Sequence, residues 1–242
     1  MKPPASTTIL GIETSCDETA AAVLDGEGHV LANVISSQQT VHERFGGVVP
    51  ELASRAHIQN VDHVTRQALD AAGLTWQDLG AIAVTQGPGL AGALLVGISY
   101  AKSLAYALGI PLVGVSHLEG HIASAWIDRP SFPRTCVVLI ASGGHTHLFH
   151  ANEAGGFHLM GRTIDDAAGE AFDKGAQMLG LGYPGGPLID AAARKGDPAA
   201  VRFPRSRVRT GQLDFSFSGL KTALLYHLQR MDQEAIVRQQ AD

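Results

Sequence analysis

Cysteine is scarce in this chain of 242 residues, which holds only Cys16 and Cys136. Two cysteines so far apart in the sequence, with no CxxC pair, do not build the framework of a disulfide-rich secreted domain, and they favour a reducing compartment. The N-terminus carries Lys2 and then Pro3 and Pro4, and it lacks the apolar run of a signal peptide. We therefore expect a cytoplasmic protein.

Positive charge is also sparse, because 18 lysines and arginines face 23 acidic residues and the net charge is -5. This balance excludes a surface coated in nucleic-acid-binding charge but leaves room for a local basic patch. The basic run of the chain contains Arg202, Arg205, Arg207 and Arg209. It is either a phosphate-contacting loop or a solvated face, and the sequence does not separate the two.

Long uninterrupted apolar runs are missing as well. Residues 90–108 are nearly long enough to span a membrane, but Lys102 and several hydroxyl side chains interrupt them. A helix buried against a sheet is the better interpretation, and no membrane partner is expected. Glycine, in contrast, is plentiful with 28 residues. Many gather at residues 87–89, 143–144 and 185–186, which suggests backbone that approaches a ligand closely.

Two histidines with metal-ligand spacing stand in the stretch His117-Leu-Glu-Gly-His121. Residues four apart lie on the same face of a helix about one turn apart. Ser116 and Glu119 have the spacing of a capping box, which would make His117 the first helical residue. A first-row divalent metal suits two imidazoles but needs at least one further donor. The alternative is one core histidine and one surface histidine.

A zinc peptidase is the obvious rival for this stretch. In those enzymes the general-base glutamate directly follows the first histidine or directly precedes the second. Glu119 is two residues from both histidines, and a helix turns it to roughly the opposite side. Peptidase chemistry is therefore disfavoured, while a metal site remains.

The chain opens with a pattern typical of a three-stranded meander, with strands over residues 8–13, 20–24 and 29–35. The first turn, residues 14–19, carries hydroxyl and acidic groups suited to a phosphate or a metal-bound phosphate. Glu13 just before this turn and Asp17 and Glu18 within it are candidate catalytic residues, and Glu13 or Asp17 is a possible oxygen ligand for the metal. A solvated turn is the alternative.

A helix follows from Pro50 to about residue 72, and Arg55, His57 and His63 are interpreted as its exposed face. Next come a strand at 81–85, the apolar helix at 90–108 and a strand at 112–115 that delivers His117. This βαβ order places the histidines at the carboxyl end of a strand, where ligands commonly bind.

The opening pattern returns after a linker at residues 129–134. Strands are expected at 136–141, 148–150 and 157–162, with the first turn at 142–146. We expect Gly143 to combine positive φ with close approach to a phosphate. The repeat predicts an α/β fold of two duplicated lobes facing one another, 1–130 and 131–242, as in the actin, sugar-kinase and Hsp70 superfamily.

Helices are expected from Asp165 to residue 179, after the glycines at 185–186, and from Leu213 to Thr222. Glycines ahead of a helix allow close approach to a nucleotide, and a carboxylate one turn inside accepts hydrogen bonds from ribose hydroxyls. Asp173 and Asp190 are candidates for that role. Solvated helix acids are the alternative.

The motifs in their order resemble those of the TsaD family. They are GIETSCDET (11–19), GGVVPELASR (46–55), GPGLAGALLVG (87–97), HLEGH (117–121), SGGHT (142–146), DDAAGEAFDK (165–174), YPGGP (183–187) and DFSFSGLKT (214–222). The resemblance implies transfer of a threonylcarbamoyl group from threonylcarbamoyl-AMP to N6 of the adenosine beside the anticodon of tRNA. It also implies a TsaB-like paralogue and a TsaE-like ATPase as partners.

The same resemblance assigns roles to individual residues. His117 and His121 match the histidines that hold iron or zinc. The remaining matches are substrate-binding residues: Ile140, Ala141, Ser142, Gly143, Gly144, Asp173, Gly186 and Asp190. In the family a further segment supplies an asparagine to the nucleotide and an aspartate to the metal, and then returns to finish the first lobe. The resemblance therefore implies a C-terminally truncated member in which the second lobe and the return to the first lobe are incomplete, and we expect weak metal binding.

Two other functions fit the fold class. Another ATP-dependent kinase or ATPase of the superfamily needs a catalytic carboxylate beside an acceptor hydroxyl and has no use for His117 and His121. A non-catalytic scaffold, like the TsaB paralogue, would not need the HLEGH and SGGHT motifs. Both therefore rank below the transferase.

Overall fold

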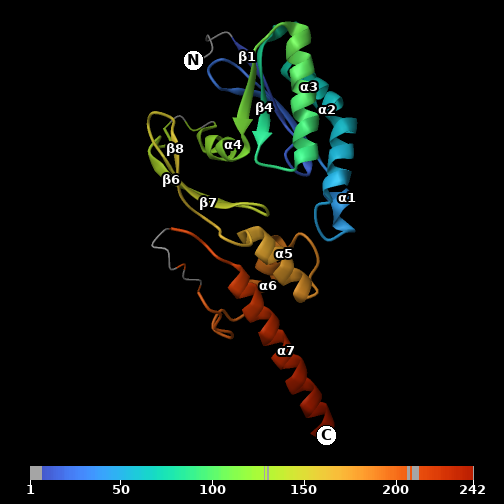
Figure 1. Ribbon diagram of the computed structural model, residues 1–242, viewed down its shortest axis with the longest axis vertical. Coiled ribbons are helices and arrows are strands. Elements are labelled where there is room, and N and C mark those ends of the chain that lie inside the picture. Colours follow the sequence, from blue (N-terminus) through green and yellow to red (C-terminus); the bar gives the residue numbers. More distant parts are fainter. Residues whose placement is uncertain (1–6, 128, 130, 206–207, 209–212, 242) are drawn as a thin grey trace. The chain divides into compact units, whose positions relative to one another are not determined.

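The computed structural model describes residues 7–127, 129, 131–205, 208 and 213–241, and for residues 232–241 only the course of the backbone. The chain forms two compact units, Met1–Phe132 and Pro133–Asp242. The expected boundary, between residues 130 and 131, differs from this one by two residues. Each unit has its own sheet and helices, so the expected α/β class is confirmed (Figure 1).

Unit 1 contains a five-stranded sheet in the order β3-β2-β1-β4-β5. The strands are β1 (Thr8–Glu13), β2 (Glu18–Leu24), β3 (Val30–Ser37), β4 (Leu79–Gly87) and β5 (Leu112–Ser116). Strands β1, β2 and β3 form an antiparallel meander, while β4 runs parallel to β1 and β5 parallel to β4. The carboxyl ends of β1, β4 and β5 therefore lie at the same edge of the sheet.

Helices α2 (Pro50–Ala72) and α3 (Ala91–Leu108) lie side by side on one face of this sheet (Figure 1). Proline in the first turn of α2 fits there because its missing N–H would have no helical partner. Both helices end at a glycine in the left-handed conformation, Gly73 and Gly109. The prediction for α2 is correct to the residue at both ends.

The core of unit 1 lies between the sheet and these helices. Strand alternation points Leu10, Ile12, Ala21 and Val23 inward, where none is more than 3% exposed. In α3 the buried residues are small and recur every four positions: Ala93, Gly97, Ala101 and Ala105. By length and composition α3 is the one helix in the described part of the chain that could cross a membrane. Here it packs on the sheet through that small-residue face.

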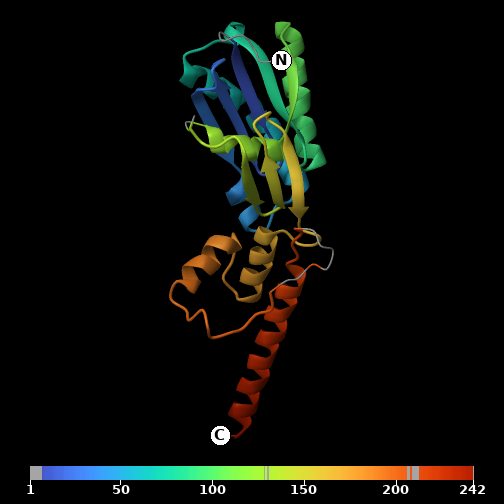
Figure 2. The same ribbon diagram turned by 90° about the vertical axis from the view of Figure 1, so that its left-hand side faces the viewer.

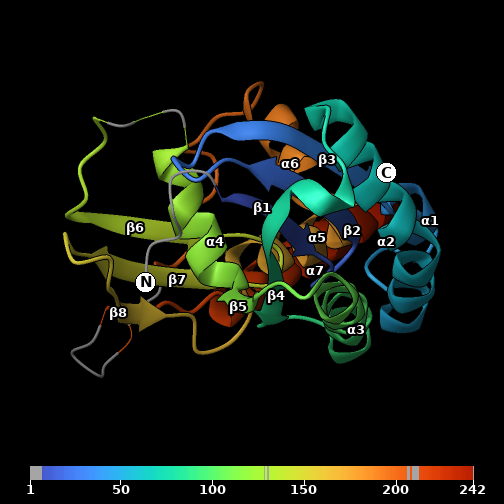
Figure 3. The same cartoon turned by 90° about the horizontal axis from the view of Figure 1, so that it is seen from above.

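Helix α4 (His117–Ala123) starts directly after β5, on the side of the sheet opposite α3 (Figure 3). Ser116 is the N-cap, and its hydroxyl accepts a hydrogen bond from the Glu119 amide at 3.5 Å. His117 is thus the first helical residue, as the spacing predicts. The short helix α1 (Gln39–Glu43) and the 3-10 turns Trp76–Asp78 and Ser124–Trp126 have no clear signal in the sequence.

Unit 2 opens with an antiparallel meander of β6 (Cys136–Ala141), β7 (Thr146–Ala151) and β8 (Phe157–Arg162). It continues with α5 (Ala168–Met178), α6 (Gly185–Ala193) and α7 (Ser218–Ala241). Helices α5 and α6 lie beside each other near the start of α7 (Figure 2).

Two helix starts in unit 2 differ from the prediction. Helix α5 begins at Ala168, not Asp165, and α7 begins at Ser218, not residue 213. The reason is a short extended contact between the two segments. Ile164 donates to the Phe215 carbonyl at 3.0 Å, and Phe215 donates to the Arg162 carbonyl at 2.9 Å. Of the basic run, Arg207 and Arg209 lie outside the described residues.

Gly161 is where this extended contact is tightest, because an added Cβ would overlap the backbone carbonyl of Leu213. Gly161→Ala should therefore destabilise unit 2 by about 1–3 kcal/mol, as overpacking against backbone does. Urea unfolding followed by circular dichroism would measure the change.

Gly219→Ala is the control, because an added Cβ at this position in the first turn of α7 meets nothing within 4 Å. Alanine there should leave the free energy of unfolding unchanged or raise it by up to about 1 kcal/mol. Equal stability of the two variants would contradict the close approach at Gly161.

Candidate functional site

The two histidines of α4 converge on one point. Their Nε2 atoms are 3.1 Å apart, and the ring centroids are 4.5 Å apart with the planes at 79°. Burial, followed by the neighbouring His117, lowers the pKa of His121 below its usual range. A neutral imidazole is the form that binds a metal, so the environment favours the ligating state.

The spacing of these nitrogens fits a metal ion. Two imidazole nitrogens bound to one tetrahedral zinc at about 2.0–2.1 Å lie about 3.3 Å from each other, close to the distance seen. Among the described residues there is no group of three or more histidine, cysteine, aspartate or glutamate side chains placed to hold a metal. The pair therefore supplies part of a coordination shell, as the sequence indicates.

Glu13, at the end of β1, lies on the other side of the His117 ring. Its Oε2 is 3.2 Å from Nδ1 of His117, and the Ser15 hydroxyl is also 3.2 Å from that nitrogen. Thr85, near the end of β4, donates its hydroxyl to Glu13 at 2.6 Å, and the Ser15 amide donates to the same carboxylate. A carboxylate behind a ligating histidine fixes its tautomer and ring orientation.

The electrostatics of Glu13 agree with this orienting position. Burial alone would raise its pKa, but hydrogen bonds from His117, Ser15 and Thr85 outweigh burial and lower the pKa to about 2. The carboxylate is thus ionised at neutral pH and accepts the Nδ1 proton of His117. The expectation that Glu13 could be a metal ligand is therefore wrong for this arrangement, because Glu13 binds the nitrogen that faces away from the Nε2 pair.

Asp17 and Glu18 are the other candidate carboxylates of this hairpin. Asp17 is half-buried and Glu18 is exposed at the start of β2. Neither joins the histidines in a group that could hold a metal. Cys16 lies between Glu13 and Asp17 in the sequence. Burial and the adjacent Asp17 raise the pKa of its thiol to about 12. It is therefore not a nucleophile at neutral pH.

A buried polar network contacts residues 14–19, the hairpin between β1 and β2. His57 on α2 reaches the Cys16 carbonyl with Nε2 at 3.0 Å and the Thr19 hydroxyl with Nδ1 at 2.8 Å. Gln38 lies 3.3 Å from His57 and 3.2 Å from Nε2 of His42. His42 and His57 are both fully buried. The prediction that His57 is exposed is wrong.

The contacts in this network fix the proton positions of both rings. The Cys16 carbonyl only accepts, so Nε2 of His57 carries a proton and Nδ1 accepts from Thr19. The Val49 amide donates to Nδ1 of His42, so the proton of His42 is on Nε2. His57 thus holds the Cys16 carbonyl in place, and His42 contacts the Gln38 side chain that lies against His57.

In unit 2 the sequence predicts a phosphate turn at 142–146, and the structure has a tight turn there. The Ser142 amide donates to the His145 carbonyl at 2.8 Å, and the His145 amide donates to the Ser142 hydroxyl at 3.1 Å. Ile140 is buried in β6, whereas Ala141 is exposed. An added Cβ at Gly143 or Gly144 would meet nothing within 4 Å, so open space lies beside both glycines.

The glycines of this turn do not serve a left-handed backbone. Neither Gly143 nor Gly144 has φ in the positive range, so the expectation of positive φ at Gly143 is wrong. Their contribution is space beside the main chain. Within the described part of the protein, the amides of both residues donate no hydrogen bond to other protein groups. Unused amides next to open space are what an anion needs.

The other predicted nucleotide contacts lie on α5 and α6. Asp173 accepts a hydrogen bond from the Gly185 amide at 2.7 Å and so fixes the start of α6. Gly186, the next residue, has open space where a Cβ would be. Asp190 forms an exposed ion pair with Arg194 at 2.8 Å. Asp173 and Gly186 are therefore close neighbours, while Asp190 sits one turn further along α6.

Sequence reasoning missed several residues of the site. Thr85 gives no pattern, because its role depends on β4 lying beside β1. For His57 a signal exists: it stands four residues after Ala53 and four before Val61, and both of these are buried. That spacing places it on the core face of α2.

These features define an α/β protein with a paired-histidine candidate metal centre in one unit and a glycine turn suited to an anion in the other. Residues 29–241 match the family described as "TsaD: tRNA N6-adenosine threonylcarbamoyltransferase". This chain belongs to the TsaD family, whose members are transferases of tRNA threonylcarbamoyladenosine modification.

Relatives with that description are similar over nearly the whole chain. The protein of Clostridium perfringens (strain SM101 / Type A) is 54% identical over 226 residues, which cover 93% of this chain and 67% of that protein. The protein of Trichlorobacter lovleyi is 57% identical over 223 residues, covering 92% of this chain and 65% of that one. The chain thus spans about two thirds of the length of these relatives.

Two solved structures are similar in fold. One is YeaZ from Pseudomonas aeruginosa, 24% identical, with a TM-score of 0.45 over 67% of this chain and 66% of that chain. The other is component A of (R)-2-hydroxyglutaryl-CoA dehydratase from Acidaminococcus fermentans, 14% identical, with a TM-score of 0.49 over 93% of this chain and 69% of that chain.

Replacing both histidines of α4 tests the metal centre. His117→Ala with His121→Ala should abolish zinc binding, because both convergent nitrogens are removed. The free energy of unfolding should fall by no more than about 1–2 kcal/mol, since other residues make the core contacts. Elemental analysis after dialysis against zinc would measure the metal, and His63→Ala on the exposed face of α2 is the control. Equal metal content in the double variant and the control would exclude the site.

His57 generates a prediction about pH. Burial lowers the pKa of His57 below its ordinary value of about 6.5, so the unfolded chain takes up a proton at this residue more readily than the folded chain. The contribution of His57 to stability is therefore fully present above pH 6.5 and is lost as the pH falls from 6.5 through the folded-state pKa.

His57→Gln is the test variant, because glutamine keeps one donor and one acceptor but does not titrate. Urea unfolding at several pH values should show a smaller loss of stability below pH 6.5 in His57→Gln than in the parent. Identical pH dependence would contradict the neutral buried state of His57. His57→Ala, which leaves the Cys16 carbonyl and Thr19 hydroxyl without this partner, should cost about 1–3 kcal/mol at neutral pH.

Proposed function

We propose that this chain binds threonylcarbamoyl-AMP through the 142–146 turn and transfers the threonylcarbamoyl group to N6 of the adenosine beside the anticodon of tRNA. The observation that carries the proposal is the turn itself. Among the residues that the structure describes, the amides of Gly143 and Gly144 have no protein acceptor, open space lies at the Cβ positions of both, and the start of α5 anchors the turn. Backbone amides at such a place bind phosphate oxygens without a charged side chain.

The rest of the nucleotide site follows from α5 and α6. Gly186 leaves room beside the main chain one residue after the amide that Asp173 holds. We assign the adenylate to this neighbourhood, with Ile140, Ala141 and Ser142 forming the strand end that leads into the turn. Asp190 is one turn inside α6, where a carboxylate suits ribose hydroxyls. Its exposed pair with Arg194 is weak enough to be exchanged for a ligand contact.

The transfer reaction forms a bond between N6 of adenosine and the carbamoyl carbon and breaks the bond from that carbon to the phosphate oxygen. AMP leaves with the electron pair of the broken bond, and the N6 amine loses a proton. No covalent enzyme intermediate is needed. Asp17 and Glu18 keep their carboxylates outside the Glu13–His117 contact. We therefore assign the proton-accepting role to these two and the orienting role to Glu13.

His117 and His121 would hold the metal ion, and iron and zinc both suit two imidazoles. When bound, the metal supplies Lewis-acid polarisation of the carbonyl of the transferred group. The protein's own part is to prepare the two rings for the metal. Glu13 leaves Nε2 of His117 without a proton by accepting the Nδ1 proton, and burial lowers the pKa of His121 and so keeps that ring neutral. We propose that the third ligand and a further nucleotide contact come from the part of the family sequence that this chain does not match.

The partners follow from family membership. We propose tRNA as the acceptor, a TsaB-like paralogue and a TsaE-like ATPase as partner proteins, and the cytoplasm as the compartment. We also interpret the meanders of the two units as a duplication. Against a kinase of the same fold class stands the convergent histidine pair, which phosphoryl transfer to a hydroxyl does not use. The same pair disfavours a scaffold without catalytic parts.

Gly143→Val tests the phosphate turn. The valine side chain would occupy the space beside the amides, so the affinity for AMP should fall by at least about tenfold, or 1.4 kcal/mol. Asp190→Ala should weaken binding less, because its contact is exposed. Isothermal titration calorimetry with AMP gives both values.

The control for this experiment is Gly196→Val, which makes the same substitution after the end of α6. There an added Cβ meets only the Ala193 carbonyl, at 3.5 Å. AMP affinity should be unchanged in the control. If Gly143→Val also binds AMP like the parent, the turn at 142–146 is not the phosphate site.

A further inference from the structure

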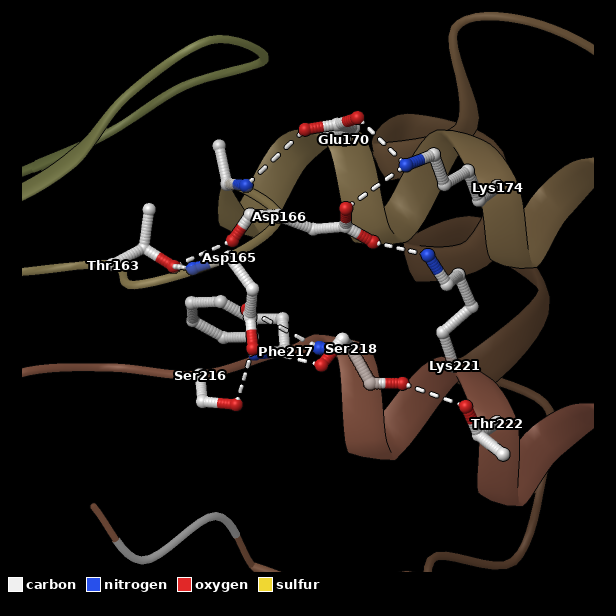
Figure 4. A network of polar contacts seen from close by, with 11 residues as sticks. Thr163, Asp165, Asp166, Glu170, Lys174, Ser216, Phe217, Ser218, Lys221 and Thr222 are labelled. Atoms are coloured by element: carbon white, nitrogen blue, oxygen red, sulfur yellow. Dashed lines mark hydrogen bonds and ion pairs between the residues drawn. The ribbon is translucent and has the colours of Figure 1, made fainter. Parts of the chain in front are cut away.

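Two motifs that are far apart in the sequence meet in unit 2. The segment before α5 contributes Asp165 and Asp166, and the segment leading into α7 contributes Ser216, Phe217 and Ser218 (Figure 4). About fifty residues separate them in the chain. None of these five residues belongs to the nucleotide site derived above, so their contact has another function.

Asp165 is the cap of α7. Its carboxylate accepts hydrogen bonds from the Ser216 hydroxyl at 2.5 Å, the Phe217 amide at 2.7 Å and the Ser218 hydroxyl at 2.7 Å. The Ser218 amide is a longer fourth donor at 3.3 Å. Burial would raise the pKa of Asp165, but these donors lower it to about 2. The start of α7 is thus tied to the residue three positions before α5.

Asp166 makes the second tie, through two ammonium groups. One carboxylate oxygen is 2.9 Å from Nζ of Lys174 on α5, and the other is 2.6 Å from Nζ of Lys221 on α7 (Figure 4). The side chains of Asp166 and Lys221 are only 15% and 25% exposed. Lys174 also binds Glu170, at 2.7 Å. An ion pair that is this well shielded resists screening by salt and holds its geometry better than a surface pair.

The same start of α5 holds the glycine turn. The Ala168 amide donates to the Thr146 hydroxyl at 2.8 Å, and the Gly169 amide donates to the Ser142 carbonyl at 3.0 Å. An added Cβ at Gly169 would lie 2.6 Å from the Ser142 carbonyl oxygen and 2.7 Å from the backbone of Gly143. The first amides of a helix have no partner within the helix, and here they bind both ends of the turn.

We propose that Asp165, Asp166 and Lys221 are positioning residues for the donor nucleotide: they fix the start of α5 against α7 and thereby hold the 142–146 turn in its binding geometry. The inference rests on the proposed function of that turn. Each step is a contact seen in the structure, from Lys221 to Asp166, from there along the chain to Ala168 and Gly169, and from these amides to Thr146 and Ser142. The described contacts of the three side chains do not include the turn, so they act through α5.

The effect expected on removal of Lys221 follows from this chain of contacts. Asp166 would keep Lys174 but lose the link to α7, so the segment before α5 would gain freedom. The Ser142 and Thr146 anchors would then move with α5. In the parent the Asp166–Lys221 ion pair keeps the start of α5 and the 142–146 turn ordered. In the variant a bound nucleotide has to order them itself, so the affinity falls although no ligand contact is removed.

The test compares AMP binding by Lys221→Met, Lys221→Arg and the parent chain. We expect Lys221→Met to bind AMP about tenfold more weakly, and Lys221→Arg to stay within about threefold of the parent because it keeps the charge. Lys195→Met, which removes one exposed positive charge after the end of α6, is the control and should bind like the parent. Urea unfolding confirms that each variant is folded before calorimetry.

Hydrogen exchange provides a second readout that a general loss of stability would not reproduce. In Lys221→Met the amides of Ala168 and Gly169 should exchange faster, while the amides of β6 and β7 keep their parent rates. If Lys221→Met fails to fold, Ser216→Ala with Ser218→Ala removes only donors to Asp165, and the same two measurements apply to it.

The outcomes separate this inference from the proposed function. AMP binding that is lost in Gly143→Val but unchanged in Lys221→Met overturns the positioning role and leaves the nucleotide site intact. AMP binding that is unchanged in Gly143→Val overturns the proposed function and, with it, the role of these residues in nucleotide binding. The exchange rates of Ala168 and Gly169 then show only whether Lys221 fixes the start of α5. Unchanged rates at both amides in Lys221→Met contradict it.

Discussion

Parallel pairing of β1, β4 and β5 is the constraint on which unit 1 depends. It brings three strand ends to one edge of the sheet, so that Glu13, Thr85 and His117 meet although they are up to about a hundred residues apart in sequence. Ser116 then starts α4 at once, which leaves His117 on its first turn and His121 one turn later. A one-residue shift in either pairing would turn Glu13 or Thr85 to the other face of the sheet and leave His117 without its carboxylate.

Unit 2 differs from unit 1 because its candidate phosphate contacts are main-chain amides and not side chains. A side chain can change its rotamer to reach a ligand, but a main-chain amide moves only when the backbone moves. The direction of the amides therefore depends on how rigidly the backbone of the turn is held. The start of α5 provides this rigidity by donating to both ends of the glycine turn, and the carboxylates before it are held by α7. In unit 1 a carboxylate orients an imidazole, and in unit 2 carboxylates orient a helix. In both units, carboxylates that do not themselves contact the proposed ligand set the positions of the groups that do.

Hydrophobic periodicity, together with the glycines and prolines at helix ends, predicts most of the helices and strands. Both signals are local properties of the sequence. β1, β6, β8 and α2 have the predicted ends, and the i,i+4 spacing of His117 and His121 does converge. Errors arise where the deciding partner is distant. Residues 213–217 look helical until Arg162 and Ile164 pair with them. The spacing of His57 with Ala53 and Val61 does indicate the core face of α2, but its polar partners Thr19 and Cys16 are distant in sequence. The sign of φ at Gly143 is likewise not encoded by glycine alone.

The claim at the centre of this account is that His117 and His121 present Nε2 to a metal while Glu13 holds Nδ1 of His117. Long-range nitrogen–proton NMR of ¹⁵N-histidine-labelled protein during zinc titration tests it directly, since the two ring nitrogens have distinct shifts. Zinc should move the Nε2 signals of both residues and leave Nδ1 of His117 protonated. Zinc binding through Nδ1 of His117, or shifts confined to other histidines, would contradict it.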